Sequence, residues 1–255
     1  MKKSIVSVEI VPQLQDNYSY IILENKTKDS IIVDPAESNS ILKKIAKQHL
    51  KLQSILLTHH HNDHTAGVKN ILKYHDVPVY SPSKNILGTT NLVKDDATIN
   101  LNFINFKVIS TPGHTKDHVI YYSEKYKLLF SGDTLFRLGC GRVFEGTYDI
   151  MHNSLKKIEN LENNTMVYCG HEYTKNNFKF LKSIFPEHQE LEYIKNNILK
   201  QMTKTHSSIP FNLGEEKNVN PFLSTKSKFY ENYKKNSNLS DFEMFSYLRK
   251  QKDNF

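Results

Sequence analysis

The 255-residue sequence lacks any long uninterrupted apolar run and contains no internal repeat. No stretch approaches the roughly 18 apolar residues that a membrane-spanning helix needs. The basic start at Met1–Lys3 is not followed by the apolar core of a signal peptide, because Glu9 interrupts it and the neighbouring valines and isoleucines alternate with polar residues. We therefore expect a cytoplasmic protein that does not act at a membrane.

Cysteine is also scarce, and Cys140 and Cys169 could form at most one disulfide bond. Because intracellular thiols are kept reduced, we expect both side chains to be free thiols. The sequence shows no histidine placed to activate either cysteine as a nucleophile. We therefore expect both cysteines to have packing roles.

The charge is unevenly distributed along the chain. The net charge is +7, and residues 174–255 hold 14 Lys and Arg against 9 Asp and Glu, which accounts for +5 of it. A basic surface attracts anions of many kinds, from nucleic acid to small carboxylates. Charge alone does not choose between these partners.

The hydrophobic pattern predicts a layered α/β domain over roughly the first two thirds of the chain. Short apolar runs bounded by turn residues predict strands within 4–34 and near 54–57, 77–80, 106–110, 119–122, 128–131 and 166–169. Apolar residues at helical spacing predict helices over 41–50, 65–74 and 150–161.

The pattern changes after residue 173, where strands give way to helices. Helical spacing runs through 174–204 and returns at 242–248. We therefore predict two domains, an α/β domain over 1–173 and a small helical domain over 174–255.

A short buried strand leads into a tract of three consecutive histidines followed by Asp63 and His64. His59 and His61 are two residues apart and project to the same side of an extended backbone, so both can ligate one metal ion. Asp63 and His64 lie further round the turn and can ligate a second ion, whereas His60 should point away. Imidazole and carboxylate ligands suit zinc, iron or manganese rather than calcium.

Three further candidate ligands, His114, Asp133 and His171, each follow another predicted strand and are each preceded by a glycine. Functional residues gather at strand ends in α/β sheets. A His-rich surface loop that binds metal adventitiously would not explain ligands at four separate strand ends. The sequence therefore predicts a functional metal site.

The T-H-x-H-x-D-H run with its later G-H, G-D and G-H resembles the metallo-β-lactamase superfamily. Within it, the chain resembles glyoxalase II (hydroxyacylglutathione hydrolase) along essentially its whole length, on four segments: Gly139–Gly146, Gly170–Thr174, Asn220–Leu223 and Arg249–Phe255. The resemblance implies an α/β fold, a four-layer αβ/βα sandwich of two face-to-face sheets with helices outside, followed by a small helical C-terminal domain that binds substrate.

The resemblance also implies a dinuclear metal centre, most simply of two Zn²⁺ ions, with iron or manganese as alternatives. One ion would be bound by His59, His61 and His114, the second by Asp63, His64 and His171, with Asp133 bridging both. Two cations that share one water lower its pKa from 15.7 toward about 7. The implied nucleophile is a metal-bridging hydroxide, held by Asp63 and Asp133, that attacks a thioester.

The implied substrate is S-D-lactoylglutathione, cleaved to D-lactate and glutathione in methylglyoxal detoxification. Arg142, Tyr173, Arg249 and Lys252 match family positions that hold the peptide. A solvated helix end would carry Arg249 and Lys252 equally well, whereas Tyr173 adjoins a predicted metal ligand. Phe144 departs from the tyrosine of many relatives, which removes one hydroxyl contact to the peptide.

Two other function classes share features with this sequence. A nuclease of the same superfamily would have a similar metal pattern and a basic surface, and its binding to nucleic acid would depend steeply on salt. A non-catalytic metal-binding or redox protein is the other alternative. We expect a monomer that takes a small glutathione thioester and no nucleic acid.

Overall fold

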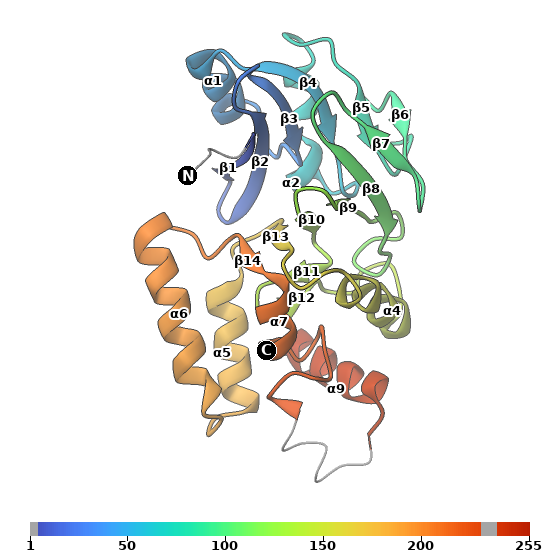
Figure 1. Ribbon diagram of the computed structural model, residues 1–255. Coiled ribbons are helices and arrows are strands. Elements are labelled where there is room, and N and C mark those ends of the chain that lie inside the picture. Colours follow the sequence, from blue (N-terminus) through green and yellow to red (C-terminus); the bar gives the residue numbers. More distant parts are fainter. Residues whose placement is uncertain (1–4, 231–238) are drawn as a thin grey trace. The chain divides into compact units, whose positions relative to one another are not determined.

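The computed structural model describes residues 5–230 and 239–255. The chain divides into two compact units, and each of them is drawn in Figure 1. Unit 1 comprises Met1–Ser110 and Asp117–Tyr126, and unit 2 comprises Thr111–Lys116 and Lys127–Phe255.

Unit 1 contains a six-stranded sheet in the order β1-β2-β3-β4-β5-β6. The first three strands are antiparallel, and the pairs from β3 to β6 are parallel. Every residue of β2 is buried, so both faces of this strand are covered. The bounds are β1 (Val6–Gln13), β2 (Asn17–Glu24), β3 (Asp29–Val33), β4 (Lys51–Leu56), β5 (Val79–Ser81) and β6 (Asn91–Leu92).

Helix α1 (Asn39–Gln48) covers this sheet with the apolar face that the sequence predicts, and Ile41 and Ile45 pack into the core. The single helix predicted over 65–74 is wrong, because the chain forms two short helices, α2 (Asn62–Thr65) and α3 (Val68–Ile71). The break lies at Gly67, whose N–H donates to the Pro35 carbonyl at 2.9 Å. A Cβ at this position would come within 2.7 Å of the same oxygen, so the chain approaches here as only glycine permits.

A second group of strands in unit 1 supports the segment that carries the histidine tract. Strand β8 (Asn105–Ser110) pairs antiparallel with β7 (Thr98–Asn100) and with β9 (Val119–Ser123). The Tyr121 hydroxyl donates to the Leu57 carbonyl at 2.7 Å, and the Val119 N–H donates to the Thr58 carbonyl at 2.9 Å. Strand β9 therefore fixes the backbone just before the first histidine.

In unit 2, β10 (Leu128–Gly132) is parallel to β13 (Met166–Cys169), which pairs antiparallel with β14 (Phe211–Asn212). Strands β11 (Leu135–Phe136) and β12 (Gly139–Cys140) form a small hairpin. Among the described residues of this unit, the helices include α4 (Tyr148–Glu159), α5 (Thr174–Ile184), α6 (Glu190–Thr205), α7 (Leu213–Val219) and α9 (Asp241–Asp253).

The helical stretch predicted over 174–204 is divided into α5 and α6, since Pro186 follows the end of α5. Helix α7 was not predicted, because its seven residues offer less than two turns of periodicity. Helix α9 begins with a capping box in which Ser240 and Glu243 satisfy each other's backbone N–H groups. In the described part of the chain, no helix is long and apolar enough to cross a membrane.

Candidate metal centre

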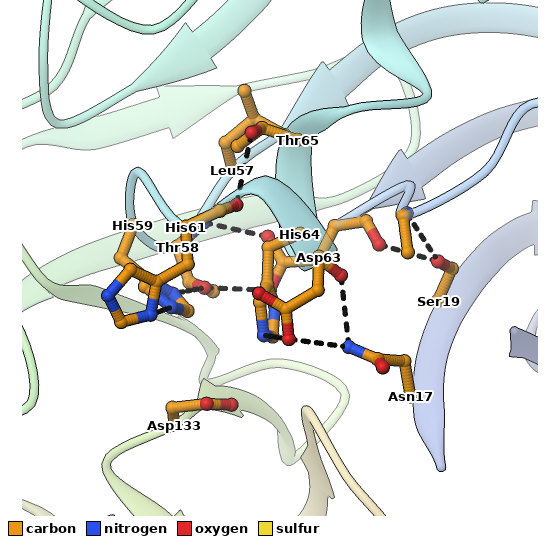
Figure 2. A network of polar contacts seen from close by, with 12 residues as sticks. Asn17, Ser19, Leu57, Thr58, His59, His61, Asp63, His64, Thr65 and Asp133 are labelled. Atoms are coloured by element: carbon orange, nitrogen blue, oxygen red, sulfur yellow. Dashed lines mark hydrogen bonds and ion pairs between the residues drawn. The ribbon is translucent and has the colours of Figure 1, made fainter. Parts of the chain in front are cut away.

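The histidine tract of unit 1 lies between the end of β4 and the start of α2, and Figure 2 shows its side chains at close range. His59 Nε2 lies 3.1 Å from His61 Nδ1. Asp63 and His64 belong to the first turn of α2, and Asp63 Oδ2 lies 3.8 Å from His64 Nε2. His59 and His64 are buried, so these donor atoms are held away from bulk water.

A buried carboxylate fixes the orientation of His64. Its Nδ1 lies 3.0 Å from Asp34 Oδ2, at the end of β3. The same carboxylate accepts hydrogen bonds from the Thr58 N–H at 2.8 Å and the Thr58 hydroxyl at 2.7 Å. An ionised carboxylate only accepts, so Nδ1 of His64 carries the proton and Nε2 presents a lone pair. Carboxylate-oriented imidazoles of this kind are typical of metal ligands.

The hydrogen bonds between Thr58 and Asp34 also orient His59. Its Nδ1 lies 2.9 Å from the Thr58 hydroxyl oxygen, whose only proton is already donated to Asp34. The hydroxyl therefore accepts from Nδ1, which leaves Nε2 of His59 unprotonated. Asp34 thus sets the tautomer of His64 directly and that of His59 through Thr58. Asp34 has a left-handed backbone conformation with φ of 48°, which is unusual outside glycine. The hydrogen bonds of its side chain to Thr58 and His64 stabilise this conformation.

Other neighbours of the tract were not predicted from the sequence. Asn17 Nδ2 donates to Asp63 Oδ2 and to the Asp63 carbonyl, both at 3.0 Å (Figure 2). His118 is fully buried and stacks on His59 with ring centroids 4.9 Å apart. His60 turns aside, with Nδ1 2.9 Å from Asp117 Oδ1. Asp34 follows a strand directly, so its place at a strand end was the available signal; Asn17 and His118 gave none.

Unit 2 brings the three remaining predicted ligands together. Asp133 follows β10 and His171 follows β13, whereas His114 lies in the loop 111–116. Asp133 Oδ2 lies 3.3 Å from His114 Nε2 and 3.2 Å from His171 Nε2. All three side chains are buried, with 4 to 5% of their surface exposed. One carboxylate oxygen is therefore shared by two imidazoles.

Backbone and aromatic contacts hold these two imidazoles. His114 Nδ1 lies 2.9 Å from the Arg142 carbonyl oxygen, which can only accept, so Nδ1 donates and in the neutral ring Nε2 carries the lone pair. The His171 ring stacks on Tyr173 with centroids 4.6 Å apart and an interplanar angle of 7°. The Phe136 ring meets His171 edge-on at 6.0 Å.

The donor atoms fit a metal ion better than they fit ion pairs. With zinc–nitrogen bonds of about 2.0–2.1 Å and tetrahedral angles, two ligand atoms lie about 3.3 Å apart. The separations of 3.1, 3.2 and 3.3 Å agree with this value, whereas the 3.8 Å between Asp63 Oδ2 and His64 Nε2 is longer. An ion-pair arrangement would need two doubly protonated imidazoles on one buried carboxylate oxygen, at a high desolvation cost. All seven predicted ligands are among the described side chains that could hold a metal ion.

The predicted peptide-binding residues of α9 differ in accessibility. Arg249 is only 4% exposed, and its guanidinium bonds Asp253 Oδ1 at 2.9 Å and the Cys140 carbonyl at 3.1 Å. Lys252 is half-buried, with its ammonium 5.0 Å above the Phe180 ring. Burial, and then the nearby Arg249 charge, lower the pKa of Lys252 to about 8.

The other predicted peptide-binding residues lie near the ligands of unit 2. The Arg142 side chain is 58% exposed, and its guanidinium lies 5.8 Å from the centre of the Phe144 ring. Phe144 is itself exposed and meets His114 edge-on at 5.2 Å. Tyr173 is half-buried against His171. Aromatic and cationic surface therefore adjoins these ligands.

The two cysteines are free thiols, as predicted. Both are buried, and burial raises the pKa of Cys140 and of Cys169 above the ordinary thiol value. A thiol with a raised pKa is a poor nucleophile at neutral pH. Neither cysteine is a candidate for catalysis.

Comparison with known proteins identifies the family of the chain. Residues 14–171 match the metallo-β-lactamase superfamily, and residues 172–255 match the hydroxyacylglutathione hydrolase C-terminus. The chain is 45% identical to a hydroxyacylglutathione hydrolase of Buchnera aphidicola subsp. Baizongia pistaciae, over 94% of this chain and 96% of the relative. It is 41% identical to the enzyme of that name from Pectobacterium carotovorum, over 96% and 98% of the two chains.

A solved structure, the BLEG-1 B3 metallo-β-lactamase, shares the fold with a TM-score of 0.65 at 23% identity, over 85% of this chain and 99% of that one. The predicted resemblance and fold class, with its helical C-terminal part, are therefore confirmed, as is the prediction of a metal-dependent hydrolase. The chain belongs to the hydroxyacylglutathione hydrolase family of the metallo-β-lactamase superfamily.

Proposed function

We propose that this chain hydrolyses the thioester of S-D-lactoylglutathione to D-lactate and glutathione, in the detoxification of methylglyoxal. The observation that carries the proposal is the near full-length identity to relatives named hydroxyacylglutathione hydrolase. The match of residues 172–255 to the C-terminus of that family extends it beyond the superfamily's shared metal motif. The nuclease and redox alternatives have no comparable support over this region.

The proposed centre holds two divalent metal ions, most simply Zn²⁺. Both sets of ligands come from the residues that the family resemblance names, and the imidazole tautomers and the donor spacings within each unit support it. His59, His61 and His114 would hold one ion, Asp63, His64 and His171 the other, and Asp133 would bridge the two.

When bound, two such cations supply Lewis acids for the thioester carbonyl and lower the pKa of a shared water toward about 7. The catalytic role of Asp63 and Asp133 would be to hold that water beside the thioester carbonyl. Asn17 orients Asp63 through its carboxylate and its backbone. The thiolate of glutathione, with a pKa near 8.5, can leave without a dedicated general acid.

The peptide part of the substrate carries two carboxylates, and the proposed binding residues supply three cations and a phenol: Arg142, Tyr173, Arg249 and Lys252. Arg142 is the more exposed of the two arginines, and its Nε lies 3.6 Å from Asp253 Oδ1, the oxygen that also pairs with Arg249. Arg249 is already paired with Asp253, so a carboxylate would have to share its guanidinium. We assign the ligand-bearing hydrolase domain to residues 1–173 and the helical substrate-binding domain to 174–255.

We propose further that the protein acts in the cytoplasm as a monomer, with no nucleic acid or membrane partner. Glutathione is the principal thiol buffer of that compartment. Two free, buried cysteines are compatible with its reducing conditions.

The direct test is turnover by the purified, metal-loaded protein. S-D-lactoylglutathione, a thioester of a simple alkyl thiol and a single-stranded RNA are offered under the same conditions, before and after treatment with a chelator. We expect rapid, chelator-sensitive cleavage of the glutathione thioester, slow cleavage of the alkyl thioester and none of the RNA. Equal rates on both thioesters would refute the glutathione assignment, and cleavage of RNA alone would favour the nuclease.

A further inference from the structure

The hairpin formed by β11 and β12 in unit 2 is held by buried polar side chains from three helices and from Asn220, which follows α7; all of them lie 35 residues or more further along the chain. These side chains bond successive backbone groups of the hairpin, from Phe136 to Cys140. Asn177 of α5 donates to the Arg137 carbonyl at 3.0 Å, and Glu216 of α7 accepts from the Leu138 N–H. Asn220 donates to the Gly139 carbonyl at 3.0 Å, and Arg249 of α9 donates to the Cys140 carbonyl at 3.1 Å.

Asn220 has the most constrained place among them. It is fully buried, and its Oδ1 accepts from the Phe222 N–H at 3.0 Å, which fixes the amide orientation. The Nδ2 group therefore faces the hairpin, where the Gly139 and Phe136 carbonyls accept at 3.0 and 3.3 Å, and the Asn220 side chain also bonds that of Glu216. Phe136 and Gly139 are paired residues on opposite strands. A single amide thus joins both strands of the hairpin.

Glu216 bonds the hairpin at its turn. Its side chain is buried and accepts from the backbone N–H of Leu138, which has a left-handed φ of 61°. Such a backbone conformation is disfavoured for leucine and persists where surrounding bonds enforce it.

The hairpin leads directly to the predicted ligands of unit 2. Asp133 lies two residues before β11, and Gly141 follows β12 with its N–H bonded to the Thr134 carbonyl at 3.1 Å. A Cβ on Gly141 would lie 1.9 Å from the Asp133 carbonyl oxygen, so the two backbones are in contact. The next carbonyl, that of Arg142, orients His114.

We propose that Asn220 and Glu216 are positioning residues for the metal ligands Asp133 and His114, acting through the β11–β12 hairpin; this rests on the proposed metal centre. Asn220 opens one of the segments typical of the family, Asn220–Leu223, and it is remote in sequence from every predicted ligand. Groups outside the first ligand shell that orient ligands typically change metal affinity by about 10- to 100-fold when removed. We expect an effect of that order here.

The isosteric variant Asn220→Asp tests the proposal with little change in volume. It places a carboxylate oxygen against two carbonyl oxygens, so the hairpin should lose its register near Asp133. Competition against a chromophoric chelator should show zinc bound roughly 10-fold or more weakly. Cobalt-loaded protein should have an altered visible spectrum, and kcat should fall while KM for the thioester changes little.

Two variants at Glu216 distinguish a loss of ligand positioning from a folding defect. In Glu216→Gln the amide oxygen can still accept from Leu138, so metal affinity and the cobalt spectrum should resemble those of the wild type. Glu216→Leu is similar in size but offers no acceptor, and it should weaken zinc binding as Asn220→Asp does. If Asn220→Asp does not fold, this pair alone decides the proposal.

Leu191→Ala serves as the control for destabilisation, because Leu191 is buried in α6 and makes no hydrogen bond to the hairpin. It should lower the unfolding midpoint and leave zinc affinity unchanged. Zinc binding of wild-type strength in both Asn220→Asp and Glu216→Leu would overturn the proposal. Failure of the wild type to cleave the glutathione thioester would refute the proposed function instead, because zinc affinity is measured without substrate.

Discussion

The ligand clusters of the two units are built in opposite ways. In unit 1 the four predicted ligands come from six consecutive residues, and their main support, Asp34, lies at the end of a neighbouring strand of the same sheet. In unit 2 the three ligands come from separate loops that lie 19 and 38 residues apart in sequence (114, 133 and 171). Their support comes from a hairpin held by three helices and by Asn220.

The difference indicates how each cluster depends on the rest of the chain. A contiguous tract needs only a strand, a turn and one buried carboxylate to place its donors. Dispersed ligands need the separate loops to be held in register, and that requires long-range contacts such as the one from Arg249 to Cys140. We therefore expect unit 1 to be sensitive to changes near its ligands and unit 2 to respond also to changes in distant helices.

The largest effect should come from the carboxylate that two imidazoles share. Asp133→Ala should remove ligands from both proposed ions and abolish turnover, whereas Asp63→Ala should weaken one ion only. Elemental analysis after dialysis should give well under one metal per chain for the first variant and about one for the second. His60→Ala is the control, because His60 bonds Asp117 instead. Two metals per chain in Asp133→Ala would contradict the bridging role.

The sequence alone predicted the contiguous tract and the strand-end ligands because each follows a short apolar run. It could not predict Asp34 as their support, since the bond from Asp34 to His64 depends on the parallel pairing of β3 with β4. The helix over 65–74 was wrong because the close approach of Gly67 to Pro35 is a tertiary contact. The periodicity of hydrophobic residues along the sequence carries no information about such tertiary contacts.

The helical part of unit 2 was less accessible to prediction for a related reason. The family resemblance predicts that Arg249 holds the peptide, yet its burial and its bond to Cys140 arise from packing between residues more than 100 positions apart. The sequence singles out Asn220 only as part of a family segment, because a buried amide in a loop belongs to no periodic hydrophobic pattern. Buried polar side chains that bond distant backbone groups are therefore the features that only the structure reveals.

A buried carboxyl group in unit 2 should make its stability depend on pH. Burial raises the pKa of Glu216 to about 7, from 4.5 in the unfolded chain. Folded protein then holds a proton that unfolded protein releases between these values. The contribution is complete below pH 4.5 and is lost as pH rises through about 7, a change of roughly 3 kcal/mol.

Urea unfolding of wild type and Glu216→Gln at several pH values between 4.5 and 8 isolates this contribution, because all other groups cancel in the difference. The difference in free energy of unfolding should shift by a few kcal/mol in favour of the variant as pH rises. A constant difference across this range would show that the carboxyl of Glu216 titrates at an ordinary pKa.

In unit 1 the matching experiment removes the buried support of the tract. Asp34→Ala deletes the acceptor that sets the tautomers of His64 and, through Thr58, of His59. We expect metal affinity to fall by about 10- to 100-fold. Asp34→Asn should recover little of it, since its amide group cannot accept from all three donors at once. Unchanged affinity in both variants would mean that the tract places its donors unaided.

The smallest effect should come from Lys252, at the edge of unit 2 and remote in sequence from every ligand. Its pKa is lowered to about 8, so it is charged at neutral pH and loses its charge as pH rises through 8. If it holds a carboxylate of the peptide, KM for the glutathione thioester should rise about 10-fold over that range while kcat changes little. Lys252→Arg should flatten the rise, because a guanidinium stays charged. The alkyl thioester should respond to neither change. A KM that stays level between pH 7 and 9 in the wild type would show that Lys252 holds no substrate carboxylate and instead contacts Asn176 and Phe180.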